Sequence, residues 1–202
     1  MPKELEKLIN AITYLPGIGE KSATKLAFFL LNSNQNFNEN LSESIKNIKT
    51  KVSFCKNCFS LCDLGQDFCN ICKDEDRDKQ TIAVVEEYLD MMMIEESGIF
   101  KGNYHILGGA ISPINGVFIG DLRFKELFER IQNADGKVEI ILATNPNIEG
   151  EATSSYIIEE IEKRKLKYKT KITKLSRGLS SGYLEYADNI TLVNALKERK
   201  EV

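Results

Sequence analysis

The chain has 202 residues, of which 42% are hydrophobic and 28% charged, and its formal net charge is -3. This balance is typical of a soluble globular protein, and no apolar run approaches the roughly 18–20 residues that a transmembrane helix needs. The acidic balance argues against a protein that coats DNA through bulk positive charge, so any nucleic-acid site must be a local patch. The amino-terminal MPKELEKLIN lacks the apolar centre of a signal peptide, and a cytoplasmic protein is therefore expected.

Residues 1–52 are predicted to form a small helical region. Two helical patterns flank the sequence LPGIG, and their apolar positions are Leu5, Leu8, Ile9 and Ile12, then Ala23, Leu26, Ala27 and Leu30. The polar stretch NSNQNFNEN, residues 32–40, predicts a loop. A third amphipathic helix is expected after it, with Leu41, Ile45, Ile48 and Val52 on its apolar face.

The LPGIG turn and the lysines after it predict a helix-hairpin-helix that binds DNA. Gly17 and Gly19 allow positive φ and a close backbone approach, and the start of the next helix can cradle a phosphate. Lys21 and Lys25 are four residues apart, so they share one helix face and add charge to the same strand. Such contacts carry no base sequence information. The alternative is a plain αα-hairpin with a glycine turn.

Residues 53–80 are predicted to form a zinc finger and a linker. All five cysteines lie between positions 55 and 72, and two Cys-x-x-Cys knuckles supply the thiolates of Cys55, Cys58, Cys69 and Cys72. Four thiolates satisfy tetrahedral zinc and leave no open position, so one structural zinc ion per chain is expected. Free core cysteines and an iron–sulfur cluster are the alternatives. Cys62 is interpreted as a non-ligand thiol, and KDEDRDK, 73–79, as a solvated linker.

From residue 81 onward strands and helices alternate. Strands are predicted at 81–87, 104–110 and 138–145, and helices at 87–97, 121–134 and 151–165. This alternation predicts an α/β domain over 81–177, with a mostly parallel sheet covered by helices. A carboxy-terminal segment with a helix, 178–202, follows it. The lysines that alternate over 165–171 predict a basic strand, which is either a protected edge strand or a DNA-facing stripe. His105 is expected to be structural.

Two segments of this domain resemble the Toprim domain of topoisomerases and primases. Glu86 ends the first strand, and ATNPNIEGEAT, 143–153, resembles the segment that reads roughly D-P-D-R-E-G-E in type IA topoisomerases. Asn145 and Asn147 stand where that segment has aspartates. Neutral amides are poor ligands for magnesium, so the metal chemistry of the domain is expected to be absent. Glu149 and Glu151 are either helix N-terminal carboxylates or an acidic docking surface for a partner.

The hairpin, the four-cysteine site and the Toprim-like sheet, in this order, resemble the RecR family of recombination mediators over almost the whole chain. LPGIGEKSATKLAFFLL, the two knuckles, VVEEYLD, ISP at 111–113, ATNPNIEGEAT, SRGL and LEYAD carry the resemblance. It implies a non-enzymatic, tetrameric DNA clamp that acts with RecO and RecF in recombinational repair. It also implies that Lys21 and Lys25 contact DNA and that Glu149 lies in the segment that contacts RecO. The chain departs from the family at Ala110 and at residues 180–184.

Two other functions stay open from the sequence. A Toprim-type metal-dependent nuclease is the first, and Asn145 and Asn147 argue against it. A pure adaptor that reaches DNA only through other proteins is the second. The DNA-binding mediator is the predicted function, and no enzymatic activity is expected.

Overall fold

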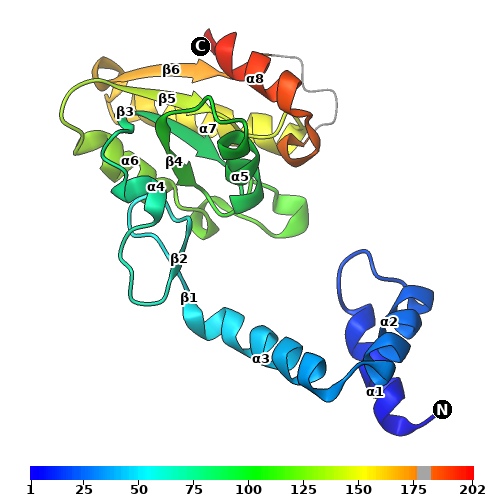
Figure 1. Cartoon of the computed structure of the whole chain (residues 1–202). Helices are drawn as coiled ribbons and strands as arrows, with labels where there is room; N and C mark the ends of the chain where they lie inside the picture. The colour runs from blue at the N-terminus through cyan, green and yellow to red at the C-terminus, as the bar shows by residue number, and fades with distance from the viewer. Residues whose placement is uncertain (177–182) are drawn as a thin grey trace. The chain divides into compact units, whose positions relative to one another are not determined.

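The structure is a computed structural model that describes residues 1–176 and 183–202. It contains two compact units, Met1–Val52 and Ser53–Val202 (Figure 1). The division into four segments stays a prediction. Among the described residues, no helix has both the length and the apolar character needed to cross a membrane.

The first unit contains helices α1 (Lys3–Thr13), α2 (Glu20–Asn32) and α3 (Gln35–Lys51). Helices α1 and α2 pack together through a small apolar cluster with Ile9, Ile12, Ala23 and Ala27 at its centre. Buried alanines on α2 let the two helix backbones approach closely, and this holds the turn between them.

The predicted loop over residues 32–40 is wrong, because α3 begins at Gln35. The Asn34 side chain caps the helix and accepts a hydrogen bond from the Phe37 N–H at 2.8 Å. Asparagine is among the best N-cap residues, and Gln35 adds a side-chain hydrogen bond to Glu39. The N-cap residue and the polar side chains of this exposed first part of α3 produce the same polar sequence as a loop, so the sequence did not distinguish the two. Helix α3 buries no residue.

The second unit opens with the metal segment, which we define as residues 53–73. It contains all but the first residue of β1 (Val52–Phe54), which pairs with β2 (Leu61–Asp63) in a small two-stranded sheet, and the short helix α4 (Asn70–Lys73). The residues after it are not simply a solvated linker. The Arg77 side chain is only 9% exposed, pairs with Glu95 and donates to the Gly102 carbonyl at 2.9 Å.

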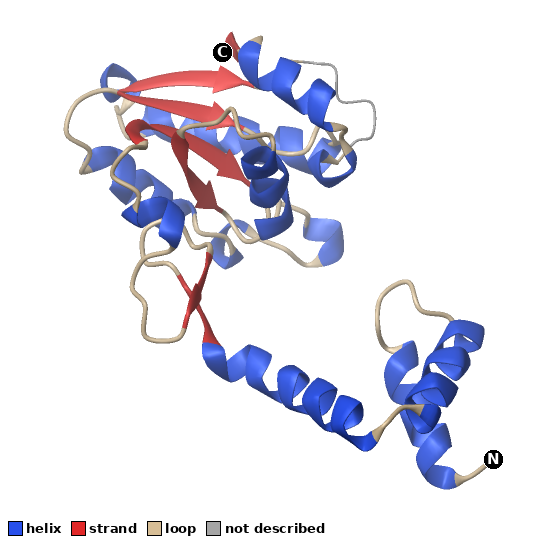
Figure 2. Cartoon of the chain, in the orientation of Figure 1, coloured by secondary structure: helices blue, strands red, loops and turns tan. Residues whose placement is uncertain are grey.

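A five-stranded sheet forms the centre of this unit (Figure 2). Its strands are β3 (Asp78–Val85), β4 (Gly102–Ile106), β5 (Val138–Leu142), β6 (Thr170–Lys174) and β7 (Lys200–Glu201). Their order is β4-β3-β5-β6-β7. Strands β4, β3, β5 and β6 run parallel to one another, and β7 is antiparallel to β6. The predicted α/β class with a mostly parallel sheet is confirmed.

Helices cover both faces of the sheet (Figure 1). Helices α6 (Phe124–Gln132) and α7 (Ile148–Lys163) pack on one face, and α5 (Tyr88–Glu96) and α8 (Asn189–Lys197) on the other. Alternate residues of β5 serve the two cores, since Ile140 faces α6 and α7 while Ile141 faces α5 and α8. Burial on both faces explains why these strands are continuously apolar in sequence.

The predicted basic strand over 165–171 is wrong. Lys165 has a positive φ of 56°, residues Lys167–Lys169 form a 3-10 turn, and β6 begins only at Thr170. The Lys169 ammonium caps the end of α6 by donating to the carbonyls of Gln132 and Ala134 at 3.0 and 2.9 Å. The lysines therefore do not share one strand face. Residues 177–182, which carry most of SRGL and of the altered 180–184 segment, lie outside the described residues.

Candidate DNA-binding turn, metal centre and acidic edge

The turn between α1 and α2 has the geometry of a backbone binding site. Gly17 has a φ of +77°, which a side chain would strain, and Gly19 is the N-cap of α2. Both are exposed, and a Cβ at either would meet no atom within 4 Å. The glycines therefore leave the backbone of the turn open on its outer side. The free backbone amides of the first turn of α2 come directly after Gly19, and amides at a helix N-terminus can bind an anion.

Lys21 and Lys25 extend this site along α2. Both side chains are exposed, and neither forms an ion pair with another described residue. They lie one turn apart on a helix anchored by the buried Ala23 and Ala27. Two unpaired ammonium groups next to free amides form a local positive patch on an acidic chain. The negative charge of Glu20, at the first position of α2, partly offsets the positive charge of the two lysines.

The structure brings four cysteines of the two knuckles together. The sulfur atoms of Cys55, Cys58, Cys69 and Cys72 all lie within 4.8 Å of one another. The Cys58 and Cys69 sulfurs are 3.5 Å apart, near the roughly 3.8 Å edge of a tetrahedron with 2.3 Å Zn–S bonds. The donor set therefore fits a divalent ion that is closed to water. Hydrogen bonding between the Cys58 and Cys69 sulfurs raises the pKa of the Cys58 thiol.

Cys62 lies beside this cluster and outside it. It is buried on β2, and burial raises the pKa of its thiol. The four clustered sulfurs are enough for a tetrahedral metal site, and Cys62 is not among them.

At the carboxyl edge of the sheet, Glu86 is held by Asn145. Glu86 is only 5% exposed, and its two carboxylate oxygens accept from the Asn145 backbone N–H at 2.8 Å and side-chain N–H at 2.6 Å. Burial raises the pKa of Glu86, and the two hydrogen bonds oppose that rise. The Asn145 side-chain oxygen in turn accepts from the Leu184 N–H at 2.6 Å. One asparagine thus binds both the Glu86 carboxylate and the Leu184 N–H at this edge of the sheet.

The second asparagine of this edge caps a helix. Asn147 is the N-cap of α7 and accepts from the Gly150 N–H at 2.8 Å. Gly150 lies so close to the edge that a Cβ there would be 2.0 Å from the Asn145 carbonyl oxygen. Both asparagines therefore have structural partners, and the N-P-N-x-E-G-E sequence packs as a tight unit.

Comparisons with known proteins agree with this arrangement. The family model "RecR, helix-hairpin-helix" matches residues 5–49, and the model "Toprim domain" matches residues 80–176. Recombination protein RecR of Herpetosiphon aurantiacus is 43% identical over 202 residues, which cover 100% of this chain and 96% of that protein. The protein of the same name from Myxococcus xanthus is 42% identical over 203 residues, 100% of this chain and 99% of that protein. The chain belongs to the RecR family.

The two acidic candidates of this RecR-family chain differ in their surroundings. Glu149 and Glu151 both lie in the first turn of α7, where the helix dipole stabilises a negative charge. Glu151 is exposed and pairs with Lys174 of β6. Glu149 is half-buried and forms no ion pair with another described residue. Ile148 beside them is 86% exposed.

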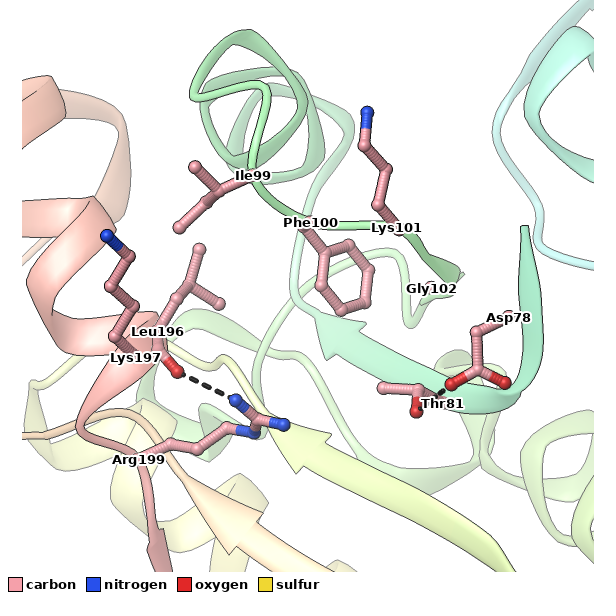
Figure 3. A pocket seen from close by; sticks show the side chains of 9 residues that line it. All are labelled: Asp78, Thr81, Ile99, Phe100, Lys101, Gly102, Leu196, Lys197 and Arg199. Atoms are coloured by element: carbon pink, nitrogen blue, oxygen red, sulfur yellow. Dashed lines mark hydrogen bonds between the residues drawn. The ribbon is translucent and has the colours of Figure 1, made fainter. Parts of the chain in front are cut away.

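A cavity of about 260 Å³ at the opposite edge of the sheet holds no catalytic arrangement among the described residues (Figure 3). The Arg199 guanidinium on its wall is already paired with Glu139, at 2.7 Å, and donates to the Leu196 carbonyl. Asp78 is bonded to Thr81 at 2.6 Å. The other two cations that line the cavity, Lys101 and Lys197, are exposed, and their side chains point away from Phe100 and Leu196 (Figure 3).

Sequence reasoning missed the residues that seat the metal segment on the sheet. Arg130 of α6 and Arg123 just before it approach the segment, and the Ile106 N–H donates to the Cys58 carbonyl at 2.9 Å. No local pattern marks these residues, because the contacts join positions roughly 50 to 70 apart in the chain.

Proposed function

We propose that this chain is a non-enzymatic, DNA-binding recombination mediator that assembles with itself into a clamp and acts in recombinational repair. Its family membership and the names of its relatives support the role in recombination. The observation that carries DNA binding is the exposed glycine turn followed by two unpaired lysines on α2. Because the turn offers amides and charge, binding is directed at phosphates and is independent of base sequence. The place of action is the cytoplasm, at the nucleoid.

The metal of this protein is one structural zinc ion per chain. Cys55, Cys58, Cys69 and Cys72 are its ligands, since four thiolates are typical of closed zinc sites. The metal segment contributes few apolar side chains to any core, so the ion supplies the stability that a core would supply.

Self-assembly into a dimer or a tetrameric ring is supported by the α3 apolar stripe, which we define as Phe37, Leu41, Ile45 and Ile48. These side chains repeat at helical spacing, and the last two are 64% and 63% exposed. An amphipathic helix without a buried face gains stability when a second copy covers that face.

RecO and RecF are the proposed protein partners, and the acidic edge is the proposed contact. Glu149, Glu151 and the neighbouring exposed Ile148 offer charge and an apolar anchor on one helix start. A basic partner surface would complement this edge.

A Toprim-type nuclease is the competing function, and the retained Glu86 is what favours it. Catalysis would require hard anionic ligands for magnesium beside Glu86. The group there is the Asn145 amide, which is already bonded to Glu86 and to the Leu184 N–H. A magnesium-dependent cleavage assay separates the two functions.

The test of the proposed function is direct DNA binding at several salt concentrations, measured by fluorescence anisotropy. The unaltered protein should bind with an affinity that falls steeply with salt, by about 0.9 log units per log unit of salt for each phosphate contact. Lys21→Ala with Lys25→Ala should weaken binding at least about tenfold and reduce that slope.

The matched control is Lys46→Ala with Lys49→Ala, which removes the same charge from α3 in the same unit. It should bind DNA nearly normally. Equal weakening by both pairs would mean that only overall charge matters, and normal binding by the Lys21 and Lys25 variant would make the hairpin a packing element. No binding by the unaltered protein would favour the adaptor function.

A further inference from the structure

Arg130 places a guanidinium beside the metal segment without an ion-pair partner among the described residues. It comes from α6, is half-buried, and its Nη1 atom donates to the Tyr104 carbonyl of β4 at 2.7 Å. The same atom lies 3.5 Å from the Asn57 carbonyl, inside the first knuckle. Arginine stays charged in proteins, so a guanidinium withdrawn from water needs a compensating negative charge.

With the proposed ion bound, the four-cysteine cluster would supply a compensating negative charge beside Arg130. Four thiolates around one divalent ion carry a net charge of about -2. Burial lowers the pKa of Arg130, and the charges of the four cysteines, Cys72 first, oppose that change. Asn57 lies between the cysteine cluster and the Arg130 guanidinium. Its side-chain N–H donates to the Cys72 sulfur at 3.4 Å, and its backbone carbonyl oxygen is the atom near Arg130 Nη1.

The surrounding contacts show that the knuckle is seated on β4 at this place. The Ile106 N–H donates to the Cys58 carbonyl at 2.9 Å. The Phe59 ring lies edge-on to His105 with 5.5 Å between centroids, and the Arg123 guanidinium lies 5.0 Å from the centre of the Phe59 ring. Cys58 and the adjacent Phe59 thus contact β4 at Ile106 and His105, next to the Tyr104 carbonyl that Arg130 binds.

We propose that Arg130 is a positioning residue of the metal centre, which balances the charge of the thiolates and holds the first knuckle against β4. This inference rests on the proposed zinc site. When the ion leaves, the cluster loses the centre that holds its two knuckles together, so the first knuckle loosens from Arg130 and from β4. Coupling of this kind is reciprocal, so removing the guanidinium weakens the hold on the ion.

The test measures the rate at which excess chelator removes zinc from the full chain at fixed pH. Arg130→Gln keeps a donor for the Tyr104 carbonyl and removes the charge, and it should release zinc about tenfold faster or more. Arg130→Lys keeps the charge and should stay within about threefold of the unaltered rate. The matched control is Arg77→Gln, because Arg77 is a buried arginine that pairs with Glu95 instead of the cysteines.

Three outcomes would overturn the proposal. One is zinc release from Arg130→Gln at the unaltered rate. Another is equal acceleration by Arg77→Gln, which would indicate general loosening of the fold. The third needs no variant: amide exchange at Ile106 should rise when chelator removes zinc from the unaltered protein, and unchanged protection would contradict the coupling.

Zinc content separates this inference from the function on which it rests. An unaltered chain that carries no zinc after purification contradicts the proposed metal site. A zinc-loaded chain whose release rate is insensitive to Arg130 contradicts only the positioning role.

Discussion

At the scale of single residues, the Asn145 amide is the hydrogen-bond partner of a buried carboxylate. Two N–H groups of Asn145 compensate the buried Glu86 carboxylate, and the Asn145 oxygen receives the Leu184 N–H. The amide can donate and accept at once, and a carboxylate cannot. Asn145 thereby connects Leu184 to the carboxyl edge of the sheet.

Asn145→Asp should therefore destabilise the fold. The change removes the side-chain donor to Glu86 and places a second carboxylate against it, which should cost about 2 kcal/mol or more in the free energy of unfolding. Urea denaturation measures this loss. Asn147→Asp is the control, because aspartate is an equally good N-cap and should change stability by less than about 0.5 kcal/mol. Similar stabilities of the two variants would contradict the role of Asn145.

The burial of His105 predicts that the stability of the fold decreases as the pH falls below about 6.5. Its side chain is fully buried, its Nε2 atom lies 2.8 Å from the Arg123 carbonyl oxygen, and burial lowers its pKa to about 3. The folded protein therefore keeps the ring neutral between pH 3 and 6.5, whereas the unfolded chain takes up a proton below about pH 6.5. The unfolded state binds more protons in this window, so acidification favours unfolding.

The measurement is the unfolding free energy of the unaltered chain minus that of His105→Gln, at pH 7.5 and pH 5. Glutamine can still donate to the Arg123 carbonyl and does not titrate. Between pH 7.5 and pH 5, the unaltered chain should lose about 2 kcal/mol more unfolding free energy than His105→Gln does. The contributions of the other ionisable groups are the same in both proteins and cancel in the difference. A difference that does not change with pH would mean that the pKa of His105 is the same in the folded and the unfolded chain, which would contradict the effect of burial.

At the scale of elements, the metal segment differs from every other part of the second unit. Its two strands have three residues each, and its buried side chains are mainly the cysteines themselves. Elements this short do not hold a fold by apolar burial, so the ion is expected to carry the stability.

Cys58→Ser should lose zinc and loosen the metal segment, whereas Cys62→Ser should retain about one zinc per chain. Cys58 is one of the four clustered sulfurs and Cys62 is outside the cluster. Metal analysis of the purified variants, with amide exchange over the segment, measures both effects. Equal zinc loss from Cys62→Ser would mean that the ligand set is wrong.

At the scale of the whole molecule, the exposed α3 apolar stripe is the proposed self-assembly surface. Ile45→Gln with Ile48→Gln should reduce the solution mass toward that of one chain, because both side chains are exposed on the α3 apolar stripe. Light scattering over a range of concentrations measures this. Ile114→Gln, at a side chain that is 97% exposed in the second unit, is the control. An unchanged mass for the α3 variant would place the self-assembly surface elsewhere.

The sequence by itself determined the order of the parts and the chemistry of each. Apolar periodicity located α1, α2 and the central strands, because burial on one face or two leaves a local pattern. Cysteine spacing located the metal centre for the same reason, since each knuckle is a local structure. Where a pattern was ambiguous the prediction was wrong: a capped polar helix resembled a loop at residues 35–40, and a lysine alternation resembled a strand at 165–171.

Only the tertiary structure decided which distant residues complete each site. The substitution of Asn145 was visible in the sequence, but its bonds to Glu86 and Leu184 span 59 and 39 residues. The approach of Arg130 to the first knuckle spans 73 residues. Parallel strands bring such residues to one edge through crossover connections, and the sequence between them has no local signal of the contact. A long-range hydrogen bond depends on the packing of the whole sheet, and the sheet exists only once the chain has folded.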